Sequence, residues 1–119
     1  MLQAFEGRAL LADEMGLGKT FQALLYAKRN KSARPIIVVC PASLKSNWAH
    51  EAWRLVGLQG EILEGRKPPA NSARRLKPAP LLIINYDILG GWLKHLRRLK
   101  PQLVILDEAH FILSLIHIS

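Results

Sequence analysis

Residues 13–20 read Asp-Glu-Met-Gly-Leu-Gly-Lys-Thr, a pattern suited to binding the phosphates of a nucleotide. Gly16 and Gly18 would let the backbone approach phosphate oxygens, and a helix beginning beside them would offer free N–H groups. Lys19 can reach the β- and γ-phosphates, and the Thr20 hydroxyl can bind Mg²⁺. We therefore predict a site for ATP and Mg²⁺, with Lys19 also serving in catalysis. The residues predicted to hold the nucleotide are Asp13, Gly16, Leu17, Gly18, Lys19 and Thr20.

A phosphate-binding loop lies between a strand and a helix, and the sequence predicts both elements around residues 13–20. The loop follows an apolar run at residues 9–12 and opens a helical pattern at residues 19–31. One position departs from the general phosphate-loop pattern, which has Gly five positions before Gly18, where this chain has Asp13. The alternative is a glycine turn between a strand and a helix that happens to precede a Lys-Thr pair.

A second candidate motif, Asp-Glu-Ala-His at residues 107–110, comes directly after the apolar run at residues 103–106. Side chains just past the carboxyl ends of parallel strands face a common crevice, so Asp107 and Glu108 are expected to lie near Lys19. Asp107 would hold Mg²⁺ through water, and Glu108 would polarise the water that attacks the γ-phosphate. For an acidic pair taken alone, a solvated strand end is the alternative.

The elements that must position these motifs alternate between strand and helix. Short apolar runs without alternation are expected for parallel strands covered on both faces, and helical spacing separates them. The alternation predicts an α/β fold with a parallel sheet. Residues 65–80, rich in Pro, Arg and Lys, are predicted to form a surface excursion around a short basic helix near Ala73. The apolar runs lie at residues 9–12, 36–40, 81–84 and 103–106, and the helical patterns at residues 19–31, 43–56 and 87–99.

Length and composition set the broad class. The chain of 119 residues fits a single domain, and its hydrophobic fraction of 50% is typical of a globular protein. Against 9 Asp and Glu, the 17 Lys and Arg residues give a formal net charge of +8, which favours a polyanionic partner such as nucleic acid or nucleotide. The lone Cys40 excludes an internal disulfide. No apolar run approaches the roughly 20 residues that cross a bilayer, so we expect an intracellular protein without a membrane partner.

The phosphate loop, together with residues 11–12 before it and Gln22-Ala23 after it, resembles the first motif of the Snf-type (Swi/Snf-like) DNA translocases, a branch of the superfamily II helicase-like ATPases. In that branch Asp commonly stands at the position of Asp13, so the departure noted above becomes an identifying feature. Further motifs follow in the family's order, and the resemblance covers about residues 7–110. These motifs are Pro41-Ala42-Ser43-Leu44 with Asn47, Trp48 and Glu51, then Asn85-Tyr86-Asp87 with Leu89, then the DEAH box at residues 107–110.

The resemblance implies a RecA-like phosphate-loop NTPase lobe with three αβα layers, partial in this chain, over residues 1–110. It also implies ATP hydrolysis coupled to movement along duplex DNA in the intact parent. A second RecA-like lobe, missing from this chain, would bring arginine fingers to the γ-phosphate, so the fragment alone is expected to show little turnover. The parent would work in the nucleus of a eukaryote, or in the cytoplasm or nucleoid of a bacterium. Two other functions stay open: a nucleotide- or DNA-binding module without hydrolysis, and a DEAH-type RNA helicase.

Candidate DNA contacts are Ser43, Asn85 and Tyr86. Ser43 stands where a helix begins after a strand, so its hydroxyl could hold a DNA phosphate or cap the helix. Asn85 and Tyr86 follow another strand and could touch DNA or simply make the turn. The tryptophans fall on helical faces and are expected in the core, and a basic run on the last helix is expected to be a solvated face, with phosphate contact as its alternative. These residues are Trp48, Trp53 and Trp92, and Lys94, Arg97, Arg98 and Lys100.

The end of the chain departs from the family, which continues after the DEAH box with a polar Lys-Asn pair and a Ser. Residues 111–119 are instead largely apolar, and our hypothesis is that this tail is not the native continuation. The family's upstream Gln motif is also missing. In related folds the strand after the DEAH box lies between the strands that carry Lys19 and Asp107. Its absence predicts a gap in the sheet, exposed edges and a marginal, aggregation-prone polypeptide.

Overall fold

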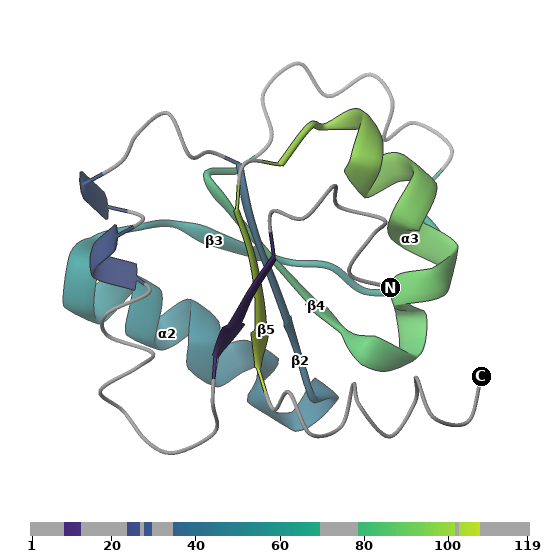
Figure 1. Ribbon diagram of the computed structural model, residues 1–119. Coiled ribbons are helices and arrows are strands. Elements are labelled where there is room, and N and C mark those ends of the chain that lie inside the picture. The colour runs from purple at the N-terminus through teal and green to yellow at the C-terminus, as the bar shows by residue number, and fades with distance from the viewer. Residues whose placement is uncertain are drawn as a thin grey trace.

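The computed structural model describes residues 9–12, 24–26, 28–29, 35–69, 79–101 and 103–107. Within these residues the fold is a five-stranded sheet in which every neighbouring pair of strands is parallel. Helices lie on both faces of the sheet (Figure 1), which gives the three layers of a RecA-like lobe. The predicted α/β class and parallel sheet are confirmed. The strand order is β1 (Ala9–Ala12), β5 (Leu103–Asp107), β2 (Ile36–Cys40), β4 (Leu81–Asn85) and β3 (Gly60–Ile62).

The central strands form where the sequence has unbroken apolar runs. β2 and β4 are buried at every residue, and β5 is buried along its middle. Strands that are covered on both faces need apolar side chains on both, which explains why these runs show no alternation. The four predicted strands are confirmed. β4 and β5 each extend one residue beyond the apolar run, so that they end on Asn85 and Asp107.

The helices also lie close to their predicted positions. α2 (Lys45–Val56) follows a short 3₁₀ turn, η3 (Ala42–Leu44), and α3 (Tyr86–Arg98) follows β4 without a break. α2 ends at Gly57, whose φ of 69° is a left-handed conformation that glycine adopts without a steric penalty. Residues 24–26 and 28–29 are helical. The rest of the helix predicted at residues 19–31, and the basic helix predicted near Ala73, lie outside the described residues.

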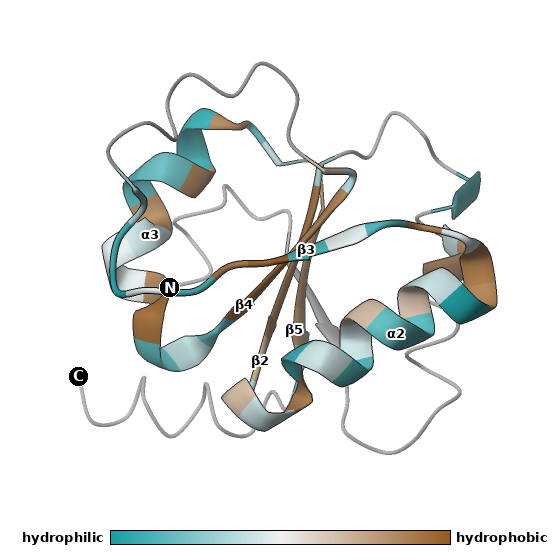
Figure 2. Cartoon of the chain, turned by 180° about the vertical axis from the view of Figure 1, so that it is seen from behind, coloured by the Kyte–Doolittle hydropathy of each residue, from teal (hydrophilic) through white to brown (hydrophobic). Residues whose placement is uncertain are grey.

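Two apolar clusters, one on each face of the sheet, anchor the helices. Alternate residues of β2 enter each cluster: Ile36 and Val38 pack with α2, whereas Ile37 and Val39 pack with α3. Leu24 joins the cluster on the α2 face. The crossover from β2 to β3 and the crossover from β4 to β5 run in opposite directions across the sheet, so right-handed connections place α2 and α3 on opposite faces. Figure 2 shows β2, β4 and β5 coloured largely as hydrophobic and much of the outer helix surface as hydrophilic.

β1 and β5 pair directly, with Ala9 opposite Val104 and Ala12 opposite Asp107. The predicted gap between these two strands is therefore wrong for the part of the chain that is described. Buried backbone N–H and C=O groups need partners, and direct pairing supplies them to both strands. The sequence pattern also fails to predict β3, because its three residues, Gly-Glu-Ile, are too few to show a period.

The tryptophans divide between the core and the surface. Trp48 and Trp92 are 3% and 4% exposed, as expected for core residues, whereas Trp53 is 65% exposed. The expectation of a core position is thus wrong for Trp53. The buried stripe of α2 runs through Trp48, Ala52 and Val56, and Trp53 lies beside that stripe, on the solvent side of the helix.

The segment that follows β3 lies against α3. The Nε1–H of Trp92 donates a hydrogen bond of 2.7 Å to the carbonyl oxygen of Gly65. A Cβ atom at Gly91 would clash with the backbone carbonyl oxygen of Arg66. The absence of a side chain at Gly91 therefore permits this close approach of loop and helix.

We predict that Gly91→Ala destabilises the fold by about 1–3 kcal/mol, because the backbone at Arg66 must move to make room. Gly90→Ala is the matched control, since a Cβ there would meet nothing within 4 Å. The control should be neutral or stabilising by up to about 1 kcal/mol, through the better helix propensity of Ala. The midpoint of urea unfolding measures both effects. Equal midpoints for the two variants would contradict the packing of this loop on α3.

Candidate active site

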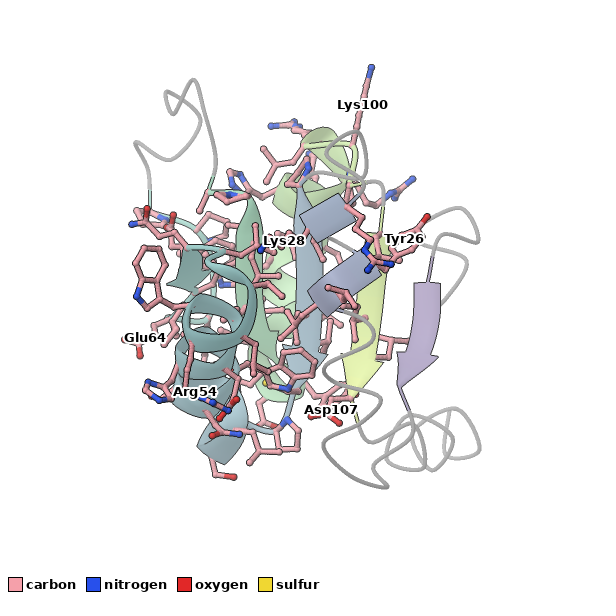
Figure 3. All side chains as sticks on the ribbon, turned by 90° about the vertical axis from the view of Figure 1, so that its left-hand side faces the viewer. Tyr26, Lys28, Arg54, Glu64, Lys100 and Asp107 are labelled. Atoms are coloured by element: carbon pink, nitrogen blue, oxygen red, sulfur yellow. The ribbon has the colours of Figure 1, made fainter. Side chains whose placement is uncertain are left out.

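The pairing of β1 with β5 brings the start of the phosphate loop to Asp107. Ala12, the last residue of β1, is the Cα partner of Asp107, the last residue of β5. The predicted phosphate loop, residues 13–20, follows Ala12 directly in the sequence. Figure 3 shows Asp107 at the end of the sheet toward which the strands run, and Lys100 at the opposite end. The other predicted site residues of the two motifs, Asp13, Gly16, Leu17, Gly18, Lys19, Thr20 and Glu108, lie outside the described residues.

Asp107 is held by two aromatic side chains. The indole Nε1–H of Trp48 donates a hydrogen bond of 2.8 Å to the carboxylate Oδ2 of Asp107. The hydroxyl of Tyr86 donates to the backbone carbonyl oxygen of Asp107. Trp48 belongs to the cluster on the α2 face and Tyr86 to the cluster on the α3 face. The last residue of β5 is therefore fixed from both faces of the sheet.

Asn85 is buried, at 6% exposure, and its side chain is tied to the first residue of α2. Lys45 Nζ donates to Asn85 Oδ1 at 3.0 Å and to the carbonyl oxygen of Leu63 at 3.1 Å. This half-buried lysine thus joins the ends of β3 and β4 to the start of α2. Tyr86, at 8% exposure, is buried as well. For these two candidate DNA contacts, burial favours the alternative of a structural role at the strand end.

Ser43 is the exposed member of the three candidate DNA contacts. It lies within η3, whose N-cap is Pro41, and the N-cap of α2 is Leu44. Ser43 is therefore the N-cap residue of neither helix. Its hydroxyl is presented to solvent at the same edge of the sheet as Asp107, because η3 follows directly on the carboxyl end of β2.

The basic run of α3 lies at the other edge of the sheet. Its residues are exposed and occupy the last turns of α3 and the segment before β5 begins. Lys100 marks this edge in Figure 3, opposite Asp107. A phosphate bound by this run would lie far from the carboxyl edge. The run consists of Lys94, Arg97, Arg98 and Lys100.

The donor chemistry at Asp107 fits Mg²⁺. Among the described residues, no group of three or more His, Cys, Asp and Glu side chains could hold a metal ion. Mg²⁺ does not need such a group, because proteins usually hold it through one or two carboxylates, with substrate phosphates and water as the other ligands. A carboxylate has two oxygens that accept several bonds, and Trp48 uses one position on Oδ2. Asp107 with Thr20 would be the residues that hold the ion.

A parallel α/β lobe in which the strand before a glycine-rich sequence ends opposite a strand that ends on an aspartate fits a RecA-like nucleotide-binding protein. The SNF2-related domain family matches residues 3–114, and the chain belongs to this family. The resemblance to the Snf-type branch is confirmed.

Several curated proteins are similar to the chain over most of its length. The SWI/SNF-related matrix-associated actin-dependent regulator of chromatin subfamily A-like protein 1 of Xenopus tropicalis is 37% identical over 112 residues, which cover 90% of this chain and 11% of that protein. The chromatin-remodeling ATPase INO80 of Arabidopsis thaliana is 39% identical over 120 residues, covering 88% of the chain and 8% of that protein. The DNA repair protein rhp54 of Schizosaccharomyces pombe is 32% identical, covering 85% and 14%. The chain thus spans about a tenth of the length of these relatives.

Trp48 and Lys45 make hydrogen bonds at this edge that the sequence pattern does not predict. The pattern predicts a core position for Trp48, which is confirmed, but not the bond from its indole to Asp107. The available signal is chemical: a buried indole N–H usually finds an acceptor. The pattern predicts no role for Lys45. Separately, none of the helices in the described residues is both long and apolar enough to cross a membrane.

We predict that Lys45→Met lowers the free energy of unfolding by about 1–3 kcal/mol, because the buried Oδ1 of Asn85 loses its donor. Lys94→Met on the exposed face of α3 is the control and should change stability by less than about 0.5 kcal/mol. Urea unfolding of both variants makes the comparison. If the two substitutions have the same effect, the Lys45 bonds do not stabilise this edge.

Proposed function

We propose that this chain is the ATP-binding lobe of a Snf-type ATP-dependent DNA translocase, in which ATP hydrolysis is coupled to movement along duplex DNA in the intact parent. The observation that carries the proposal is the pairing of Ala12 with Asp107. That pairing starts the predicted phosphate loop beside the first residue of the DEAH box. The SNF2-related domain match and the printed names of the relatives, which include a chromatin-remodeling ATPase and a DNA repair protein, support it.

The proposed chemistry divides among four residues. Lys19 binds the β- and γ-phosphates and neutralises charge that develops during γ-phosphate transfer. Thr20 and Asp107 hold the magnesium ion, Asp107 through water. Glu108 accepts a hydrogen bond from the attacking water and orients it toward the γ-phosphate. Magnesium, when bound, supplies positive charge to the phosphate oxygens and fixes the position of the triphosphate.

The proposed DNA contact is a phosphate held at Ser43. The hydroxyl is exposed, and it lies at the carboxyl edge that also carries Asp107. Phosphate contacts of this kind position a protein on DNA without reading its sequence. The formal charge of +8 would add a long-range attraction to the duplex. Arginine fingers for the γ-phosphate would come from the second RecA-like lobe of the parent.

We predict that Glu108→Gln in the intact parent reduces DNA-stimulated ATP hydrolysis by about 10²–10⁴-fold, because the amide cannot accept the proton of the attacking water. Binding of ATP should persist, since the phosphate loop is unchanged. Glu64→Gln, at an exposed glutamate after β3, is the matched control and should leave hydrolysis at the unmodified rate. Phosphate release in the presence of duplex DNA is the measurement.

Hydrolysis that survives in Glu108→Gln would contradict the catalytic assignment and favour a module that binds nucleotide without cleaving it. The nucleic acid that stimulates hydrolysis distinguishes a DNA translocase from the remaining alternative, an RNA helicase. Duplex DNA should stimulate the unmodified protein, whereas stimulation by RNA alone would favour an RNA helicase.

A further inference from the structure

The two bonds that hold Asp107 point to a role for the residues that make them. We infer that Trp48 and Tyr86 are positioning residues of the magnesium site, which fix the carboxylate and the backbone of Asp107 from opposite faces of the sheet. This inference rests on the proposed function, because it takes Asp107 to hold the magnesium ion through water.

Trp48 restricts the carboxylate itself. Its ring is 3% exposed, and its Nε1–H donates to Oδ2 of Asp107 at 2.8 Å. An indole is a donor only, so it does not compete with the carboxylate for the metal ion. The ring is packed between α2 and the sheet with Ile105 in the same cluster, so the donor cannot turn away without opening the core. The bond therefore selects one orientation of the Asp107 side chain.

Tyr86 restricts the backbone at the same residue. It is the first residue of α3, it is 8% exposed, and its hydroxyl donates to the carbonyl oxygen of Asp107. β5 ends here, and in the described residues β1 is its only neighbour at this position, because the pairing with β2 stops at Leu106. Among the described strands, the sheet supports β5 at Asp107 only through β1, and the hydroxyl of Tyr86 adds a second support. With the backbone fixed by Tyr86 and the carboxylate by Trp48, little freedom is left to Asp107.

Groups that orient a metal ligand typically change metal affinity by about 10- to 100-fold when they are removed. We predict that Trp48→Phe in the intact parent raises the Mg²⁺ concentration needed for half-maximal binding of a fluorescent ATP analogue by about this factor. Tyr86→Phe should raise it in the same direction. Binding is measured rather than turnover, so the readout does not depend on the hydrolytic step.

Trp92→Phe is a closely matched control. Trp92 is 4% exposed and its indole donates a bond of 2.7 Å, but the acceptor is the Gly65 carbonyl on the other face of the sheet. Trp92→Phe should lower stability much as Trp48→Phe does and leave the Mg²⁺ requirement unchanged. If Trp48→Phe and Trp92→Phe have the same Mg²⁺ requirement, Trp48 is only a core residue and the inference is overturned.

A second measurement covers the case in which Trp48→Phe does not fold. 5-Fluorotryptophan placed at position 48 of the otherwise unmodified parent should change its ¹⁹F chemical shift when Mg²⁺ is added to the ADP complex. The same label at position 92 should not respond. An unchanged resonance at position 48 would overturn the inference. The proposed function fails separately, through a Glu108→Gln variant that still hydrolyses ATP.

Discussion

Parallel pairing between β1 and β5 fixes the register on which the candidate site depends. The two strands end together, with Ala12 opposite Asp107, so the last residues of β1 and β5 lie at one edge. Side chains alternate along a strand, and a slip of one residue would turn Asp107 to the other face. It would then point away from Trp48, whose indole binds it from the α2 face. The backbone ladder and the buried indole therefore specify the same register.

The direction of the crossovers explains why residues from distant parts of the chain meet at this edge. In a parallel sheet each helix that follows a strand begins at the carboxyl edge. η3 with α2, and also α3, begin there after β2 and β4. Ser43, Trp48 and Tyr86 all come early in these elements, so they share one edge although they belong to separate motifs. The basic run that ends α3 is carried to the opposite edge by the same geometry.

Much of this arrangement could be predicted from the sequence, because the fully buried strands are unbroken apolar runs with few competing interpretations. The four apolar runs become strands within one residue of the expected bounds, and α2 and α3 are shifted by no more than two residues from the patterns predicted at residues 43–56 and 87–99. β3 could not be predicted from three residues of mixed polarity, since what defines it in the described structure is its pairing with β4. The direct pairing of β1 with β5 is equally non-local. The pairing depends on which neighbouring strand is present to bond the backbone N–H and C=O groups, and the sequence of neither strand indicates its neighbour.

The polar contacts at the site were the least predictable, because they are set by burial rather than by local pattern. Asn85 and Tyr86 sit in a motif whose polar side chains could equally face DNA or the interior. Their burial favours the interior, since a buried amide needs a partner, and Lys45 supplies it to Asn85. Trp53 illustrates the opposite error. Its position beside the buried stripe of α2 differs from that of Trp48 by a fraction of a turn, which is enough to place one indole in solvent and the other against Asp107. Aromatic character alone therefore does not distinguish a core residue from a surface one, whereas a buried N–H beside an acidic strand end does mark a candidate positioning residue.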